Sequence, residues 1–332
     1  MIQKLVRDFV KNELIPLENL VIENEAKRGL NDDRIIPEEI ENDLIQKVSK
    51  IGLWGLDVPE EYGGVGIGNL AKAVVMEELG KTIVPFNIPP DAPNLHFLIK
   101  CCNEEQRERY LMPYIRGEKR SAIAITEPNA GSDIGAMEMR AERKKGKWVL
   151  NGTKIFISGA KQADFIITMA VTDPVKRQRG GITAFLVDRD TPGLTITRGI
   201  PTIGEHHPYE VHYDNVELSD NQVLGEVGNG FGPMQDRLNI RRIEIAQRCV
   251  GMAERVVDMM ARYALQRKTF GQYLADRQAI QWWLADSSTD IHATRLMAYH
   301  AAWKMDQGMD IRKEASMLKV YATEMATRVI DR

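Results

Sequence analysis

The sequence predicts a multidomain α+β protein in which a small β domain lies between two helical domains along the chain. The chain has 332 residues, more than one hydrophobic core usually carries, so two or three domains are expected. Apolar residues recur at helical spacing in both terminal parts, and short β-rich segments separated by turns fill the middle. We therefore expect an N-terminal helical domain at 1–120, a small middle β-barrel or sandwich at 121–225, and an incomplete antiparallel helix bundle at 226–332.

The N-terminal part reads as a series of helices. Ile2, Val6 and Phe9 lie at helical spacing, and Pro16 is expected to end that helix. Pro37 is typical of a helix start, so a second helix is expected to run from there to about residue 51. The same reasoning predicts further helices at 70–80, 93–101 and 104–115.

The pattern changes at Ser121, where short alternating segments begin. Strands are expected at 121–126, 137–143, 148–150, 154–158, 164–172, 182–187, 194–198 and 210–218. No long helix separates these segments, which argues against a doubly wound parallel sheet and favours a small barrel or sandwich. The basic run from Arg143 to Lys147 is broken by Gly146, so it indicates a solvated hairpin turn instead of a track for phosphates.

The chain becomes helical again after Gly232. Leu238, Ile245, Met252 and Met259 repeat every seven residues, as in the seam of a long bundle helix. A second helix is expected within 274–307, and a third begins near Glu314.

The glycine-rich stretch GEVGNGFG, residues 225–232, precedes that first long helix. Pro233 stands where a dinucleotide-binding fingerprint would need its third glycine, and no parallel βαβ unit is predicted around it. The stretch is interpreted as a turn that links two domains.

Composition excludes several classes of protein. Lys and Arg number 44 against 47 Asp and Glu, so no nucleic-acid partner is expected, and no apolar run is long enough to predict membrane insertion. Three cysteines, including the adjacent Cys101 and Cys102, form no disulfide framework, which favours a reducing, cytoplasmic location. His206, His207 and His212 lack the spacing of a metal motif, so no metal site is expected.

Seven motifs occur in an order that resembles the acyl-CoA dehydrogenase family, and the resemblance covers essentially the whole chain. They are MEELG (76–80), EEQRERYLMPYIRGE (104–118), ITEPNAGSD (125–133), NGTKIFISGA (151–160), DNVELSDNQVLGEVGNGF (214–231), YALQRKTFGQYLADRQAIQ (263–281) and AAWKMDQG (301–308). The resemblance implies that FAD is the cofactor and an acyl-CoA thioester the substrate. One departure is the shortened stretch IGEHHPYEVHYDNV (203–216), which leaves this edge of the acyl-binding region unpredicted.

The resemblance assigns the flavin to the middle domain. A flavin ring is flat and mostly apolar, with polar atoms along one edge that need backbone donors and a short hydroxyl. By resemblance, Ala124, Ile125 and Thr126 line the pyrimidine side, while Phe156 and Ser158 pack on the flavin from a second strand. The family commonly has Trp and Thr at these last two positions. Taken alone, TEPNAGSD would instead be read as a β-turn.

Residues nearer the C-terminus are assigned to CoA and to a second FAD. By resemblance, Ser132 contacts the thioester arm of CoA and Arg242 its adenosine end, since a guanidinium binds phosphate and stacks on a purine. Arg267, Thr269, Phe270 and Gln278 match residues that reach the FAD bound mainly by a neighbouring subunit. The alternative for Arg267 is an ordinary surface charge.

The resemblance supplies no catalytic base within residues 1–332. The family's carboxylate base usually lies several tens of residues past Arg332, so the chain is expected to lack the usual C-terminal segment and the catalytic residue is left unassigned. Some relatives place the base at the position of Arg241, which cannot accept a proton. Arg241 hints instead at substrate binding, to a polar or acidic acyl group. Glu244, three residues on, is expected to be its ion-pair partner in preference to a substitute base.

These observations predict an FAD-dependent acyl-CoA dehydrogenase that forms a 2,3-enoyl-CoA and passes electrons to an electron-transferring flavoprotein. Two alternatives stay open. An acyl-CoA oxidase would keep the fold and pass electrons to oxygen. A catalytically silent partner subunit would assemble with an active homologue. A homo-oligomer, either a dimer or a dimer of dimers, is also expected.

Overall fold

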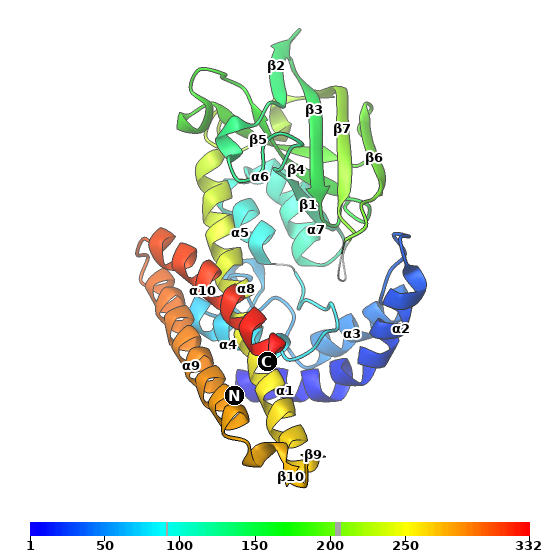
Figure 1. Cartoon of the computed structure of the whole chain (residues 1–332). Coiled ribbons are helices and arrows are strands. Elements are labelled where there is room, and N and C mark those ends of the chain that lie inside the picture. Colours follow the sequence, from blue (N-terminus) through cyan, green and yellow to red (C-terminus); the bar gives the residue numbers. More distant parts are fainter. Residues whose placement is uncertain (91, 203–206) are drawn as a thin grey trace.

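The computed structural model describes residues 1–90, 92–202 and 207–332. A β domain forms one end of the molecule, and helices from both ends of the chain form the other (Figure 1). Helix α8 (Phe231–Gln266) starts beside the β domain and runs through the helical part to the opposite tip. The predicted order of helical, β and helical parts is confirmed.

The N-terminal helices enclose a core that includes Val6, Leu14, Leu44 and Val48. Their bounds are α1 Ile2–Phe9, α2 Glu18–Arg28, α3 Glu38–Lys50, α4 Asn69–Leu79, α5 Ala92–Cys101, α6 Glu104–Gln106 and α7 Met112–Ile115. The predicted helix that runs to Pro16 is wrong in detail. Helix α1 ends at Phe9, and the chain continues through a π turn and a 3₁₀ turn into α2. Pro16 lies at the start of the 3₁₀ turn, where its missing N–H costs no helical hydrogen bond.

The middle domain is an eight-stranded sheet in the order β6-β7-β3-β2-β4-β5-β8, with β1 paired in parallel to β4. The strands are β1 Ser121–Ala124, β2 Arg140–Lys144, β3 Lys147–Ile157, β4 Phe165–Val171, β5 Ile182–Asp188, β6 Leu194–Gly199, β7 Tyr209–Leu218 and β8 Val223–Leu224. Leu150, Ile166, Phe185 and Val211 pack together from both halves of the sheet, so the predicted small β domain is confirmed. The two strands predicted at 148–150 and 154–158 form one strand, β3, with two irregularities.

The turn that joins β2 to β3 carries the basic run. Lys145 and Gly146 both have positive φ, as a two-residue hairpin turn requires. Arg143 pairs with Asp220 and Lys147 with Glu217, all on the surface. The predicted solvated hairpin is therefore confirmed.

The glycine-rich stretch before α8 packs closely on β5. A Cβ on Gly228 would lie 2.3 Å from the carbonyl oxygen of Gly180, and one on Gly230 would lie 2.7 Å from the amide nitrogen of Ala184. Strand β8 is antiparallel to β5, so no βαβ unit surrounds these glycines. The interpretation as a linking turn is confirmed.

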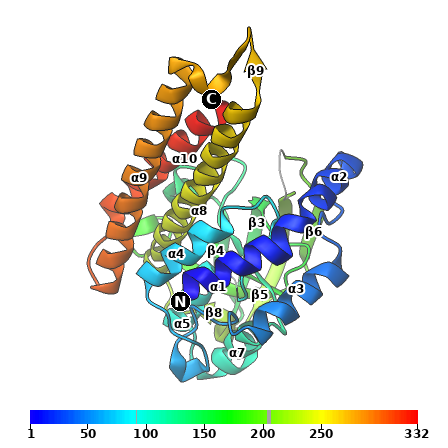
Figure 2. The same ribbon diagram turned by 90° about the horizontal axis from the view of Figure 1, so that it is seen from below.

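The C-terminal part is an antiparallel bundle of α8, α9 (Gln278–Asp306) and α10 (Arg312–Asp331), seen from below in Figure 2. A small hairpin, β9 Lys268–Thr269 with β10 Gln272–Tyr273, follows α8. At about 1.5 Å per residue, the 36 residues of α8 span about 54 Å. No helix in the described ranges combines the length and apolar character needed to span a bilayer.

Helices α4 and α8 cross with their backbones in contact. A Cβ on Gly251 would lie 1.9 Å from the carbonyl oxygen of Glu77, and one on Gly80 would lie 2.3 Å from that of Arg248. The crossing therefore requires glycine on both helices. It also buries the acidic pair of the MEELG motif, because Glu77 is 3 % exposed and Glu78 is fully buried.

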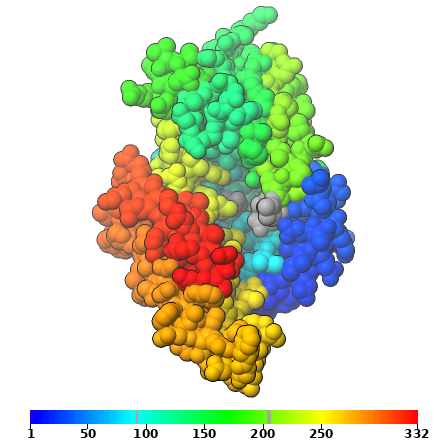
Figure 3. Space-filling model, in the orientation of Figure 1, coloured from blue at the N-terminus to red at the C-terminus, as the bar shows by residue number. Residues whose placement is uncertain are grey.

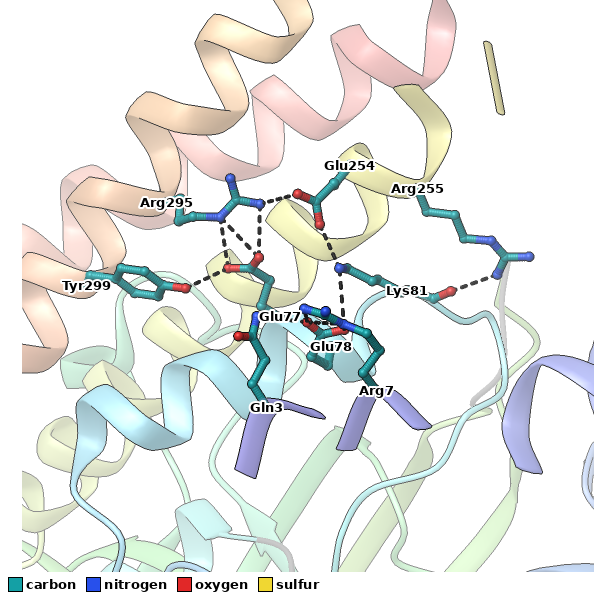
Figure 4. Close-up of polar contacts among 9 residues, drawn as sticks. All are labelled: Gln3, Arg7, Glu77, Glu78, Lys81, Glu254, Arg255, Arg295 and Tyr299. Atoms are coloured by element: carbon teal, nitrogen blue, oxygen red, sulfur yellow. Dashed lines mark hydrogen bonds and ion pairs between the residues drawn. The ribbon is translucent and has the colours of Figure 1, made fainter. Parts of the chain in front are cut away.

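An ion network compensates these buried carboxylates (Figure 4). Glu78 accepts a hydrogen bond from Arg7 of α1 at 2.8 Å. Glu77 pairs with Arg295 of α9 at 2.9 Å, and the same guanidinium reaches Glu254 of α8 at 2.7 Å. The network thus ties four helices together around the crossing, which matters because an uncompensated buried charge is strongly destabilising.

We predict that Glu78→Gln lowers the free energy of unfolding by about 2–3 kcal/mol at pH 7, because it weakens charge-assisted hydrogen bonds at a buried site. Burial raises the pKa of Glu78, but the hydrogen bond from Arg7 and the charge of Lys81 outweigh it, so the pKa is lowered. The carboxylate's stabilisation is complete above its unfolded pKa and is lost as pH falls through the lower folded pKa. Chemical denaturation of both proteins from pH 7 to pH 3 should therefore show their difference shrinking below about pH 4.5.

The exposed Glu61→Gln is the matched control and should change little at either pH. If Glu78→Gln lowered the free energy of unfolding by the same amount at pH 3 and pH 7, the stabilisation would not come from the ionised carboxylate of Glu78.

Candidate flavin and acyl-CoA site

The TEPNAGSD loop is a closed turn at the end of β1. Ala124 is fully buried and pairs with Thr168 of β4. The Glu127 amide donates to the Ala130 carbonyl at 2.9 Å, and the Ala130 amide donates back to Glu127 at 3.2 Å. The loop therefore has a fixed shape, with Pro128 exposed at its tip.

A buried ion pair joins this loop to β3. The Lys154 ammonium lies 2.8 Å from Glu127 Oε1 and donates to the Ile125 carbonyl at 2.9 Å. Glu127 also accepts the Met139 amide at 3.1 Å. Both charged side chains are buried, and burial lowers the pKa of Lys154 to about 8, with the Glu127 carboxylate opposing that shift.

Phe156 is strained and exposed beside this loop. It lies where the pairing of β3 with β7 is irregular, its φ is +59°, and its side chain is 54 % exposed. The preceding residue, Ile155, donates its amide to the Thr126 carbonyl at 2.9 Å. A bulky residue in the left-handed region is unusual and is often found at binding sites. The structure thus brings Thr126 and Phe156 together, and the exposed Ser158 begins the turn that follows β3.

The residues assigned to CoA lie in two places. Ser132 is exposed at the end of the TEPNAGSD loop. Arg242 is half-buried on α8 and donates to Asn239 Oδ1 at 3.0 Å. Arg241, the neighbouring residue, pairs with Glu244 at 3.1 Å, so the predicted ion pair is confirmed.

A small recess lies beside Glu244, one helical turn from Arg241. Its walls are mostly apolar and come from α4, the segment 87–90 and the loop before α4, with Glu244 contributed by α8. Lys72 pairs there with Glu244 and, at 2.7 Å, with Asp57. Burial raises the pKa of Glu244, but the charges of Lys72 and Arg241 outweigh it and the pKa is lowered. Glu244 is therefore an ionised partner of two cations and is poorly suited to act as a base.

Sequence reasoning missed the buried lysines of both clusters. Lys72 and Lys154 are 7 % and 0 % exposed, yet lysine is seldom buried unless it is paired. A usable signal for Lys72 was its place on α4 among Ala73, Val75 and Met76, which are buried. For Lys154 the signal was its central position in a strand.

Four predicted cofactor-binding residues lie at the far end of α8. Arg267 ends that helix, Thr269 and Phe270 belong to the hairpin, and Gln278 begins α9. Phe270 is fully exposed at the hairpin tip with a φ of +50°. This end of α8 forms the tip of the molecule opposite the β domain (Figure 3). One chain therefore does not bring these residues to the Thr126 loop.

The histidines show no metal arrangement in the ranges that the structure describes. His206 lies outside those ranges, as does the start of the shortened stretch at 203–205. His207 is buried, and His212 contacts the Thr153 hydroxyl at 3.1 Å. No group of three or more metal-ligating side chains occurs among the described residues.

Comparison with known families decides what kind of protein carries this site. The profile of the acyl-CoA dehydrogenase N-terminal domain matches residues 1–118, that of the middle domain matches 122–216, and that of the C-terminal domain matches 228–332. The chain belongs to the acyl-CoA dehydrogenase family. It is an oxidoreductase of a family of FAD flavoproteins, so the predicted family and cofactor are confirmed at that level.

Three known proteins show the extent of the similarity. The (R)-benzylsuccinyl-CoA dehydrogenase of Thauera aromatica is 46 % identical over 339 residues, covering 100 % of this chain and 84 % of the relative. Subunit CarC of the caffeyl-CoA reductase-Etf complex of Acetobacterium woodii is 33 % identical, covering 99 % and 85 %. The solved FAD complex of PigA has a TM-score of 0.84 at 27 % identity, covering 99 % of this chain and 84 % of that one.

The residues of this acyl-CoA dehydrogenase family member fit the flavin of its family. Phe156 presents a flat apolar ring, while Thr126 is half-buried and Ser158 exposed, so both hydroxyls can reach a ligand. The Thr126 amide has no acceptor among the residues that the structure describes. A flat apolar ring can cover the face of a flavin, and the hydroxyl and amide donors beside it can bind the polar edge of the flavin.

We predict that Phe156→Ala weakens FAD binding about tenfold, because it removes an aromatic contact of the size found between stacked rings. Thermal stability should barely change, since the side chain is largely exposed. Flavin fluorescence titration measures the affinity, and a thermal melt without added FAD measures the stability.

Val175→Ala provides the control, because Val175 is a 90 % exposed apolar residue of the same domain. Equal FAD affinity of the Phe156→Ala and Val175→Ala proteins would argue that Phe156 does not face the flavin.

Proposed function

We propose that the protein catalyses FAD-dependent α,β-dehydrogenation of an acyl-CoA thioester to its 2,3-enoyl-CoA. The observation that carries the proposal is the strained, exposed Phe156 held beside the unpartnered Thr126 amide, within the described residues, in a chain of this family. Electrons pass to an electron-transferring flavoprotein, in line with the Etf complex to which the relative from A. woodii belongs by its name. The cytoplasmic location inferred from the cysteines stays a prediction.

In this proposal the middle domain holds the flavin edge. Ala124 and Ile125 supply backbone to the pyrimidine side, the Thr126 and Ser158 hydroxyls donate to it, and Phe156 covers a ring face. FAD, when bound, accepts the hydride that leaves the β-carbon of the acyl group. The chain's own task is to hold the thioester against that ring, with Ser132 at the thioester arm and Arg242 at the adenosine end of CoA.

The base that removes the α-proton is not assigned within residues 1–332. Arg241 cannot accept a proton, and Glu244 is paired with Lys72 and Arg241. We keep the prediction that the base is a carboxylate past Arg332.

The acyl group is proposed to carry a second carboxylate. The relative from T. aromatica acts, by its name, on benzylsuccinyl-CoA, whose acyl part has an aromatic ring and a second carboxylate. The walls of the recess are largely apolar, as a ring would need, and Arg241, whose side chain is 34 % exposed, lies one helical turn from Glu244 at the recess. A guanidinium suits a second carboxylate because it can bind one with two parallel hydrogen bonds.

A homo-oligomer is proposed from the far end of α8. The exposed apolar residues there are Tyr263, Leu265, Phe270, Tyr273, Trp282 and Trp283. A monomer seldom exposes so many large apolar side chains together, so a second copy is proposed to cover them and to receive Arg267, Thr269, Phe270 and Gln278 at its FAD. If light scattering showed a monomer at micromolar concentration, the proposed homo-oligomer would be refuted.

We predict that Arg241→Gln raises KM about tenfold to a hundredfold for an acyl-CoA with a second carboxylate, because a charge-assisted hydrogen bond is lost. KM for butyryl-CoA, which has no such carboxylate, should change little. Anaerobic bleaching of the flavin by each thioester, followed by steady-state assay with an electron-transferring flavoprotein, measures both.

Arg262→Gln, at an exposed position of the same helix, is the control. Equal losses for both thioesters would remove Arg241 from carboxylate recognition. Rapid turnover with peroxide release in air would favour the oxidase, and the absence of bleaching by every thioester would favour the silent subunit.

A further inference from the structure

We propose that Lys154 is a positioning residue that makes the bound flavin easier to reduce, acting through the Ile125–Thr126 peptide group. The inference rests on the proposed flavin site and concerns a side chain that does not touch the ligand itself. Lys154 is fully buried, and its ammonium donates to the Ile125 carbonyl at 2.9 Å.

The geometry of one peptide group links the ammonium to the flavin side. The Ile125 carbonyl and the Thr126 N–H belong to the same planar peptide, and in a trans peptide they point in opposite directions. Lys154 occupies the carbonyl end, while the N–H end has no acceptor among the described residues. A cation on the oxygen polarises the whole amide and makes its N–H a stronger donor.

The surrounding contacts keep the ammonium on that carbonyl. Glu127 lies 2.8 Å from Lys154, but its carboxylate also accepts the amides of Glu138 and Met139. Its negative charge is therefore shared among several donors. The next peptide group is fixed as well, because the Thr126 carbonyl accepts the Ile155 amide.

A polarised N–H at the flavin edge has a definite consequence. Reduction adds negative charge to the pyrimidine side of a flavin, and a preorganised donor in a water-excluded site stabilises such charge strongly. Lys154 should therefore raise the flavin midpoint potential and tighten FAD binding. Because the pKa of Lys154 is lowered to about 8, part of this effect should disappear as the pH rises past that value.

The test compares the full chain with its Lys154→Met variant. We expect the variant to bind FAD about tenfold to a hundredfold more weakly and, once saturated with FAD, to have a lower midpoint potential measured against reference dyes. Lys154→Arg should recover part of both losses, since it restores the cation. Unchanged potential in FAD-saturated Lys154→Met protein would overturn the proposal.

Lys81→Met is the matched control, because Lys81 is likewise an ion-paired lysine but lies in the helical part, where it pairs with Glu254 at 2.7 Å and Glu78 at 3.3 Å. It should lower thermal stability and leave the potential unchanged. A fall in potential equal to that of Lys154→Met would show a general effect of lost stability and overturn the assignment.

If Lys154→Met does not fold, the pH dependence of the flavin midpoint potential tests the proposal instead. When the midpoint potential of the unsubstituted protein is plotted against pH and corrected for the flavin's own proton uptake, the slope should change at a break near pH 8. Glu127→Gln should move that break to lower pH, because the Glu127 carboxylate raises the pKa of Lys154. A break that stays in place in Glu127→Gln, or none at all, would refute the inference. Failure of the unsubstituted chain to bind any FAD would instead refute the proposed flavin site.

Discussion

The backbone contact between α4 and α8 is the constraint on which the helical part of the molecule depends. Gly80 and Gly251 let the two helices approach until each touches a carbonyl of the other, and no other residue fits there. So close a crossing leaves the carboxylates of Glu77 and Glu78 in the interior. Cations from α1 and α9 must then reach them, so four helices meet at one place. The MEELG motif is thus explained by packing and charge together.

The same crossing sets the geometry of the recess that is proposed to hold the acyl group. It fixes the part of α8 that carries Arg241 and Glu244 relative to the part of α4 that carries Lys72, and the ion pair across the gap then closes one side of the recess. The residues proposed to bind the flavin edge are positioned independently of this crossing, because Thr126 and Phe156 are held by β-sheet pairing and by the buried Lys154. Two rigid parts of the chain, one helical and one of β structure, therefore hold the residues proposed to bind the substrate and the flavin. Each is stabilised by a buried lysine that bridges two segments of the chain.

Regular periodicity made most elements predictable, and local geometry accounts for the rest. Helix α8 and the alternating strands were found because apolar spacing reports secondary structure directly. The predicted seam of α8 was wrong, because Met252 and Met259 are 39 % and 58 % exposed and the buried face carries Ile243, Ala246 and Val250 instead. The predicted end of the first helix at Pro16 was wrong because Pro16 lies in a 3₁₀ turn, which accommodates a proline that the interior of an α-helix would not. The motifs located Thr126 and Phe156, but not the positive φ that exposes the ring. Lys72 and Asp57 were missed because their pairing joins segments that are distant in sequence, and single-sequence spacing carries no information about such contacts.

The unbroken length of α8 also limits which insertions and deletions the protein can tolerate. Each residue added to an α-helix turns everything beyond it by about 100° and advances it by about 1.5 Å. One insertion between Arg242 and Gly251 would therefore swing the β9–β10 hairpin to another side of the molecule and remove Gly251 from its crossing. An insertion of seven residues would nearly restore the direction, yet it would displace the hairpin by about 10 Å. Differences in length among homologues should consequently gather in the loops, while α8 keeps a constant number of residues.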